Sequence, residues 1–174
     1  MEIGISSKIP TYSGGLGVLA GDFLKAASDM SYPIVGVTLL NKHGCFFQVI
    51  FEGKQSEEES NWSIDDFLEP VDEKISIKIR DREVAVGCWL LNVEGLEGSV
   101  TPVLFLHTDL PDNSEKDKDI TDILYGAGDT YRLEQEIILG IGGMRMLKKL
   151  GFNSIEKFHM NEGHAAFLAL ELNK

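Results

Sequence analysis

The chain has 174 residues, of which 43% are hydrophobic and 25% are charged, and its formal net charge is −12 at pH 7. This composition predicts a folded domain, alone or as part of a larger one, and excludes a disordered chain. The acidic balance argues against nucleic acid and anionic membrane surfaces as partners, because both require a basic face.

The sequence also gives expectations about location. No apolar run approaches the about 18–20 residues that a membrane span requires, so we expect no membrane segment. The first ten residues lack the pattern of a secretory signal. The two cysteines, Cys45 and Cys88, have no metal or redox spacing. We therefore expect a cytoplasmic protein.

The N-terminal part predicts a loop, a helix and a strand in that order. "YSGGLGVLAGDFLKAASD" at 12–29 places three glycines in four positions just before a helical pattern. An apolar helix face of about three turns is predicted by the spacing of Leu19, Phe23, Ala26, Ala27 and Met30. The β-branched run at 33–40 predicts a strand buried on both faces.

The middle of the chain has a different character. Residues 45–54, 74–79 and 82–93 are strand-like, with Asp81 in a tight connection between the last two. They predict a mostly antiparallel excursion over residues 45–93. The acidic run at 57–73 is typical of a solvated loop or strand edge. Residues 102–109 return to the continuous apolar pattern of a buried parallel strand.

The C-terminal third predicts a long helix, a last strand and the start of a last helix. Leu133, Ile137, Ile141, Met144 and Leu147 share one helix face, and Gly151 follows two lysines as a helix stop. The glycines at 140, 142 and 143 predict close packing on another helix or on the sheet. Residues 155–161 predict the strand. The alternation of strands and helices predicts an α/β fold with a mostly parallel sheet.

Ligands bind such sheets where strands end and helices begin, which selects two stretches. The first is the glycine loop. Gly15, Gly17 and Ala20 match the dinucleotide pattern G-x-G-x-x-[G/A], but no strand precedes the loop and no ribose-binding acid follows the next strand. Free amides at the helix start instead predict a cradle for an anion or a sugar phosphate. A purely structural turn is the alternative.

The second stretch is Asn161-Glu162-Gly163-His164. With His159 it forms H-x-x-E-x-H, which lacks the spacing of a zinc site on one helix face, so we expect no metal. Asn161, Glu162 and His164 could line a pocket for a hydroxyl-rich ligand, or His164 could simply cap and pack. Glu134 and Glu136 could be catalytic carboxylates, or could favour the start of a helix.

These same residues carry a family resemblance. "MEIGISSKIPTYSGGLGVLAGDFLKAASD" is similar to the glycine-loop region of the α-glucan phosphorylases that act on glycogen, starch or maltodextrin, especially those of bacteria and archaea. The similarity continues in order through "YPIVGVTLLNKHGCFFQ", "DLPDNS", "ILYGAGDTYRLEQEIILGIGGMRMLKKLG" and "FHMNEGHAAFLALE". It is weakest across about 55–100.

The resemblance implies phosphorolysis: inorganic phosphate releases α-glucose 1-phosphate from an α-1,4-glucan with retained configuration. It implies pyridoxal phosphate as cofactor, with its attachment lysine in a C-terminal domain outside this chain. Gly14, Gly15, Leu16 and Gly17 match the loop near the phosphates and the glucosyl unit. Asn161, Glu162 and His164 match the motif that lines the sugar pocket.

The implied fold is part of the N-terminal Rossmann-like domain of a GT-B enzyme, incomplete at both ends of residues 1–174. We expect this polypeptide alone to be inactive, and its expected partners are glucan, phosphate and either a second copy or a complementing C-terminal half. Two alternatives stay open. One is a nucleotide-sugar glucosyltransferase of the glycogen or starch synthase kind, and the other is a non-catalytic remnant that binds glucan or a partner.

Overall fold

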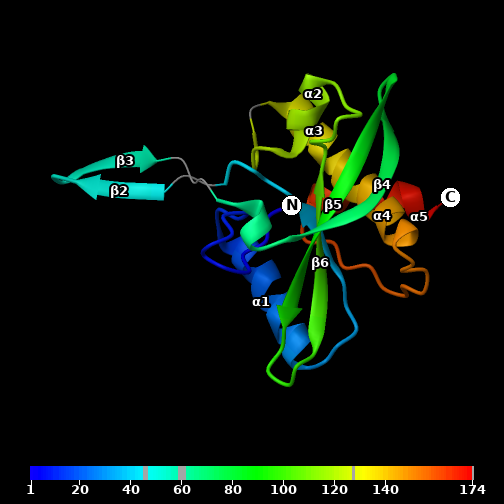
Figure 1. The fold of residues 1–174 in the computed structure, drawn as a ribbon, viewed down its shortest axis with the longest axis horizontal. Helices are drawn as coiled ribbons and strands as arrows, with labels where there is room; N and C mark the ends of the chain where they lie inside the picture. The colour runs from blue at the N-terminus through cyan, green and yellow to red at the C-terminus, as the bar shows by residue number, and fades with distance from the viewer. Residues whose placement is uncertain (45–46, 59–61, 127, 174) are drawn as a thin grey trace.

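The computed structural model describes residues 1–44, 47–58, 62–126 and 128–173. Its main sheet has four strands in the order β1-β6-β5-β4. The strands are β1 (Gly36–Leu39), β4 (Glu69–Ile79), β5 (Arg82–Glu94) and β6 (Val100–His107). A separate hairpin of β2 (Phe47–Phe51) and β3 (Lys54–Glu58) projects from the body (Figure 1).

The sheet is mixed. β1 and β6 are parallel, as predicted for these two apolar runs, whereas β6 with β5 and β5 with β4 are antiparallel. The prediction of a mostly parallel sheet is therefore wrong, while the antiparallel excursion is confirmed by β2–β3 and β4–β5. The reason is the short connections. A two-residue turn at Arg80-Asp81 can only reverse the chain, and residues 95–99 do the same between β5 and β6.

Helices cover both faces of this sheet (Figure 1). One face packs against α1 (Gly15–Asp29) through a cluster that contains Leu24, Val103 and Phe105. The other face packs against a long helical stretch through a cluster that contains Leu106, Ile138 and Met146. Such a two-sided arrangement explains why β1 and β6 are apolar throughout, whatever the direction of their neighbours.

The long helical stretch consists of α3 (Asp129–Ile137), a π-helical segment (Ile138–Gly142) and α4 (Gly143–Lys149). Its end is as predicted, since Gly151 follows with φ 89°. The π segment shifts the buried face, so Leu133 is 45% exposed while Ile138 is fully buried. The remaining helical pieces are short: α2 (Glu115–Lys118), α5 (Leu168–Leu172) and three 3-10 turns at Ile64–Asp66, Asp119–Thr121 and Gly163–Ala165.

Two of the three glycines in this stretch allow the predicted close packing. A Cβ on Gly140 would lie 2.6 Å from the backbone nitrogen of Leu168, and one on Gly143 would lie 3.1 Å from Val37 on β1. The helix therefore packs closely on both α5 and the sheet.

Two further predictions differ from the structure. Residues 155–161 form no strand; a strand requires a hydrogen-bonded neighbour, and this segment has none among the described residues. The predicted apolar face of α1 is largely exposed, with Leu19 at 62%, Phe23 at 48% and Met30 at 77%. The buried face of α1 consists instead of Gly17, Gly21, Leu24, Ala27 and Ser28, and Gly21 packs directly on the carbonyl of Gly4 in the N-terminal segment.

Candidate functional site

The glycine loop leads into α1 at the surface. Residues 13–16 are exposed, and Gly14 is the extended N-cap, with φ −159° and ψ −165°. The first helical hydrogen bond runs from the Val18 amide to the Gly14 carbonyl, at 3.2 Å. The amides of Gly15, Leu16 and Gly17 therefore have no partner within the helix. No hydrogen bond from them occurs among the described residues. Gly15 and Leu16 are exposed and can donate to a ligand, whereas Gly17 is buried.

The glycines of the loop are required for two different reasons. A Cβ on Gly14 or Gly15 would meet nothing within 4 Å, so these positions leave open space beside the amides. Gly17 is buried, and a Cβ there would lie 2.5 Å from the Cβ of Tyr12 and 3.1 Å from Glu2. The absence of a side chain at Gly14 and Gly15 therefore leaves room for a ligand. At Gly17 it allows close packing against Tyr12 and Glu2.

Glu2 holds the loop from the inside. Its buried carboxylate accepts hydrogen bonds from the amides of Ser13, at 2.6 Å, and Gly14, at 3.2 Å, both to Oε2. Its Oε1 accepts a hydrogen bond from the hydroxyl of Tyr125, at 3.2 Å. Sequence reasoning missed Glu2, although it lies in the same resembling stretch as the loop, because its spacing from the loop matches no known binding pattern. The signal that could have found it is a lone acid among apolar N-terminal residues.

The motif at 161–164 lies against the same loop. The Asn161 side-chain amide donates to the Leu16 carbonyl at 3.4 Å, which joins residues 145 positions apart. Glu162 is exposed and has φ 60°, and this sharp turn starts the 3-10 helix at Gly163. The structure therefore brings the two stretches selected from the sequence together at Asn161.

His164 points into a polar and aromatic setting. It is buried, and its Nδ1 lies 3.4 Å from Glu136 Oε1 and 3.4 Å from the Arg132 guanidinium. The two contacts need opposite tautomers, since a protonated Nδ1 donates to Glu136 and an unprotonated one accepts from Arg132. The Tyr125 ring lies 5.6 Å from the imidazole and also has Arg132 over its face, at 5.5 Å.

The carboxylates at 134 and 136 therefore have separate roles. Glu134 is buried and forms an ion pair with Arg82 on β5, at 2.9 Å. Glu136 faces His164 instead, and Arg132 contacts it at 3.4 Å. Of the two, Glu136 lies beside the candidate site, where it can orient His164.

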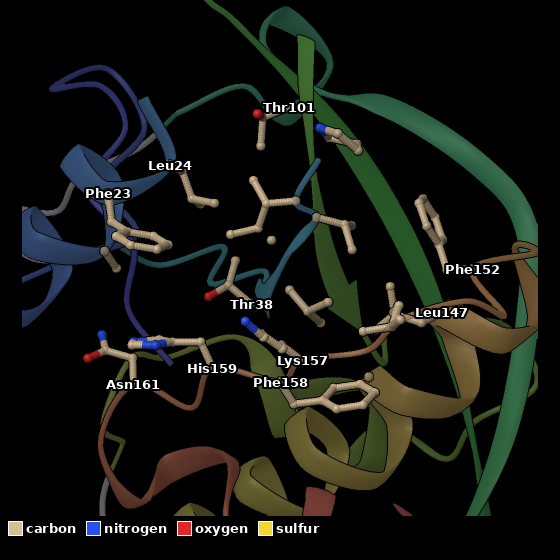
Figure 2. A pocket seen from close by; sticks show the side chains of 18 of the residues that line it. Phe23, Leu24, Thr38, Thr101, Leu147, Phe152, Lys157, Phe158, His159 and Asn161 are labelled. Carbon is tan, nitrogen blue, oxygen red and sulfur yellow. The ribbon is translucent and has the colours of Figure 1, made fainter. Parts of the chain in front are cut away.

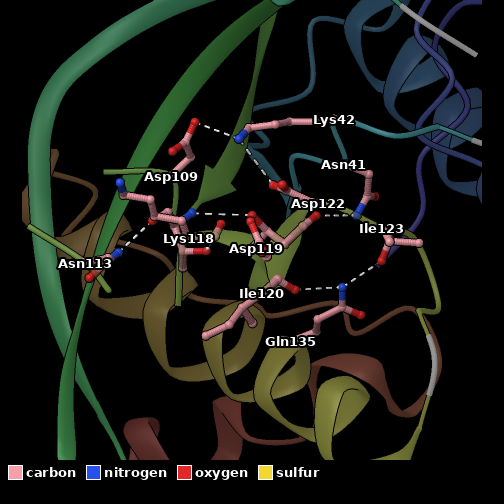
Figure 3. A network of polar contacts seen from close by, with 12 residues as sticks. Asn41, Lys42, Asp109, Asn113, Lys118, Asp119, Ile120, Asp122, Ile123 and Gln135 are labelled. Carbon is pink, nitrogen blue, oxygen red and sulfur yellow. Dashed lines mark hydrogen bonds and ion pairs between the residues drawn. The ribbon is translucent and has the colours of Figure 1, made fainter. Parts of the chain in front are cut away.

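A polar network fixes the loop that leads to Tyr125 (Figure 3). The Asn41 side chain donates to the Thr121 carbonyl at 2.8 Å, and the Gln135 side chain donates to the carbonyls of Ile120 and Ile123, each at 2.9 Å. All these contacts tie the loop to the end of β1 and to α3. Tyr125 can therefore act as a fixed link between Glu2 and His164.

Lys42 adds charge to this network (Figure 3). Its ammonium group contacts Asp109 at 2.6 Å and Asp122 at 3.5 Å. Burial raises the pKa of the Asp122 carboxyl above its ordinary value. The nearby Lys42 ammonium group acts in the opposite direction and favours the charged form of Asp122.

The arrangement can bind an anion next to a polar ligand. Three unpaired amides at the start of a 15-residue helix lie at the positive end of its dipole. Asn161 and the neighbouring polar residues offer donors and acceptors for hydroxyl groups.

The described part of the chain contains no group of three or more His, Cys, Asp or Glu placed to hold a metal ion. Within it there is also no helix of the length and apolarity needed to cross a membrane.

The structure defines an α/β domain with unpaired amides at the start of a helix, an arrangement that can bind an anion. The family model for carbohydrate phosphorylase matches residues 11–84, which include the loop and α1. The chain is 42% identical to a maltodextrin phosphorylase of Thermococcus litoralis over 96% of its length. It is 35% identical to a glycogen phosphorylase of Mycobacterium tuberculosis and 32% identical to one of Aquifex aeolicus, over 98% and 97% of its length.

The resemblance seen in the motifs is therefore confirmed: the chain is similar to carbohydrate phosphorylases over nearly its whole length. It spans 20%, 21% and 25% of the lengths of these three relatives. The similarity covers both the glycine loop and the 161–164 motif, since it extends over nearly the whole chain.

Proposed function

We propose that the chain forms one wall of the active site of an α-1,4-glucan phosphorylase. The reaction is the attack of inorganic phosphate on the terminal α-1,4-linked glucose of a glucan, which releases α-glucose 1-phosphate. The observation that carries the proposal is the contact of Asn161 with the Leu16 carbonyl. This contact supports the proposal because it joins the polar 161–164 motif to the loop that carries the unpaired amides.

The glycine loop would bind the phosphate oxygens. The amides of Gly15, Leu16 and Gly17 are fixed by the helix, so they can stabilise developing negative charge without reorganising. Gly14 would let the phosphate approach, since it carries no side chain beside the amides. Donors of this kind need no lysine or arginine, which reconciles an anionic substrate with a net charge of −12.

Asn161, Glu162 and His164 would bind the glucosyl unit on the same side. Asn161 is already oriented by the loop, and Glu162 is exposed where a sugar could reach it. His164 would be held by Glu136 and Tyr125 and would present its remaining ring nitrogen to a hydroxyl group. Their common task is to fix the sugar with its anomeric carbon facing the phosphate, which is a large part of catalysis by positioning.

Pyridoxal phosphate is the cofactor that we propose for the complete enzyme, where its phosphate group supplies a proton-transfer partner for the substrate phosphate. The open space at Gly14 and Gly15, beside unpaired amides, fits a phosphate group. The attachment lysine would come from a C-terminal domain. Lys8 and Lys25 are not proposed for this role; Lys25 lies 3.9 Å from Asp22 on the outer surface of α1.

In this proposal the chain is part of the N-terminal, Rossmann-like domain of a GT-B enzyme, and the cleft forms against the cofactor domain. A second copy or a separate C-terminal half are the partners that fit. A cytoplasmic location belongs to the same proposal, as Cys88 is a buried free thiol; Cys45 lies outside the described residues.

A chimera tests the proposal. The chain replaces the matching stretch of the Thermococcus litoralis maltodextrin phosphorylase, and release of glucose 1-phosphate from maltodextrin is measured. We expect the chimera to be active and the isolated chain to be inactive, because catalysis by positioning fails when one wall is missing. ADP-glucose in place of glucan and phosphate tests the synthase alternative.

Variants of the chimera test the residues. Asn161→Ala and His164→Ala should each lower kcat/KM at least tenfold, whereas Lys8→Ala, on the exposed surface, should not change it. Absorbance of the bound cofactor and the melting temperature show that each variant is folded and loaded. Folded, loaded variants at 161 and 164 with unchanged kcat/KM would contradict the proposal.

A further inference from the structure

A part-buried hydrogen bond joins the glycine loop to the surroundings of His164. The Tyr125 hydroxyl donates to Glu2 Oε1 at 3.2 Å, although the two residues lie 123 positions apart in the sequence. The other oxygen of the same buried carboxylate accepts from the amides of Ser13, at 2.6 Å, and Gly14, at 3.2 Å. One side chain therefore binds both the loop and Tyr125.

Tyr125 is held in an unfavourable backbone conformation. Its φ is 54°, in the left-handed region that bulky residues rarely adopt. Strain of this kind persists where the surrounding structure enforces it, and it is concentrated at functional sites. The hydrogen bond to Glu2 can enforce it from one side, and the network of Asn41 and Gln135 fixes the preceding loop on the other (Figure 3). The position of the Tyr125 ring is therefore specified by the surrounding structure.

The Tyr125 ring in turn influences which group faces His164. Its centroid lies 5.6 Å from that of the imidazole and 5.5 Å from the guanidinium carbon of Arg132, which it attracts through its face. Arg132 and Glu136 each lie 3.4 Å from His164 Nδ1 and require opposite protonation states of that nitrogen. A shift of the ring would move Arg132 and change the balance between these two contacts.

The surface contacts between the two stretches are weaker candidates for this alignment. His159 stacks on Phe23 of α1, with the ring centroids 5.4 Å apart, and both side chains are exposed. Asn161 donates to the Leu16 carbonyl at 3.4 Å. Figure 2 shows Phe23, His159 and Asn161 together at one side of a pocket. Exposed contacts of this kind open most readily, so the alignment depends on the internal contacts.

We propose that Glu2 and Tyr125 are positioning residues that couple the amides of the glycine loop to the orientation of His164. Glu2 fixes the backbone at Gly14, and Tyr125 fixes the contact of Arg132 with the histidine. In the proposed reaction this coupling would keep the phosphate-binding amides and the sugar-binding histidine in one fixed relation, as catalysis by positioning requires. That use of the link rests on the proposed function, whereas the link itself can be measured in the free chain.

The test uses the ¹⁵N-labelled chain and a matched pair of tyrosine variants. Tyr125→Phe keeps the ring and removes only the hydroxyl that binds Glu2. Tyr131→Phe is the control, because its hydroxyl also binds the segment before Tyr125. That hydroxyl donates to the Asp119 carbonyl at 2.8 Å and accepts from the Ile123 amide at 3.2 Å, and neither contact involves Glu2.

Hydrogen exchange of the Gly14 amide, the ring-nitrogen chemical shifts of His164 and the melting temperature are measured for each protein. We expect Tyr125→Phe to speed exchange at Gly14 at least threefold and to change the His164 shifts, because both ends of the link are released. Tyr131→Phe should lower the melting temperature at least as much, since it loses two hydrogen bonds, but should leave Gly14 and His164 unchanged. Equal effects of the two variants at Gly14 and His164, or no effect of Tyr125→Phe on either, would overturn the inference.

Glu2→Gln and the double variant Glu2→Gln/Tyr125→Phe complete a double-mutant cycle. If the two residues form one link, the double variant should exchange at Gly14 no faster than Glu2→Gln alone, and additive effects would overturn the inference.

A titration with inorganic phosphate, followed at the amides of Gly15 and Leu16, separates the link from the proposed function. The affinity for phosphate should fall at least threefold in Tyr125→Phe, and an unchanged affinity would overturn the positioning role. Failure of the unsubstituted chain to bind phosphate would contradict the proposed function, and the results at Gly14 and His164 would still decide whether the link exists.

Discussion

Gly17→Ala is predicted to destabilise the chain, although alanine is the better helix former. The new Cβ would lie 2.5 Å from the Cβ of Tyr12, an atom fixed to the backbone, and 3.1 Å from the Glu2 carboxylate. Overpacking of this kind costs about 1–3 kcal/mol, and helix propensity returns about 0.8–1.0 kcal/mol. We expect a net loss of about 0–2 kcal/mol in the free energy of unfolding.

Gly15→Ala is the matched control, two residues earlier in the same helical turn. Its Cβ would meet nothing within 4 Å, so only helix propensity changes, and stability should stay the same or rise by up to about 1 kcal/mol. With a urea m value of about 2 kcal/mol/M, the two midpoints should differ by about 1 M. Equal midpoints, or a more stable Gly17→Ala variant, would refute the assignment of a packing role to Gly17.

Three further predictions concern buried charges. Glu2→Gln should lower the free energy of unfolding by about 1–2 kcal/mol, because it weakens the charge-assisted hydrogen bonds to the loop. Hydrogen exchange of the loop amides should become faster. Unchanged exchange would contradict the role of Glu2 in holding the loop. Arg82→Met should cost about 3–5 kcal/mol in a urea titration, since it leaves the buried carboxylates of Asp117 and Glu134 without their partner; a neutral result would contradict this. On folding, the pKa of the Met1 amino group falls from 8.0 to about 6. The unfolded chain therefore binds more protons between these values, and the free energy of unfolding should rise with pH across pH 6–8. N-terminal acetylation should remove that rise, and identical pH profiles of the two forms would contradict the prediction.

The local order of elements could be predicted from the sequence, but the direction of neighbouring strands could not. Residues 102–109 have the continuous apolar pattern predicted for a parallel strand because helices cover both faces of the sheet. That pattern reports burial and carries no information on direction. The short connections at 80–81 and 95–99 do carry it, and they give antiparallel pairs.

The candidate site could be predicted only in part, because some of its contacts depend on tertiary packing. The glycine loop and Asn161 stand out as motifs, but the sheet topology used to select them is not present, since no strand precedes the loop and residues 155–161 form none. Glu2 and Tyr125 lie in stretches that carry the resemblance, but no spacing indicates their contacts, since they reach the loop and His164 only through tertiary packing. The predicted strand at 155–161 depends in the same way on a neighbour, which local propensity cannot supply.

The most direct test of the central claim is an NMR titration of the ¹⁵N-labelled chain with glucose 1-phosphate, with glucose as the uncharged control. We expect saturable shifts of the amides of Gly15, Leu16 and Gly17 with glucose 1-phosphate only. The Gly98 amide, which donates to Gly95 in a distant turn, should not move. Unchanged loop amides, or equal shifts at Gly98, would contradict an anion site at the start of α1.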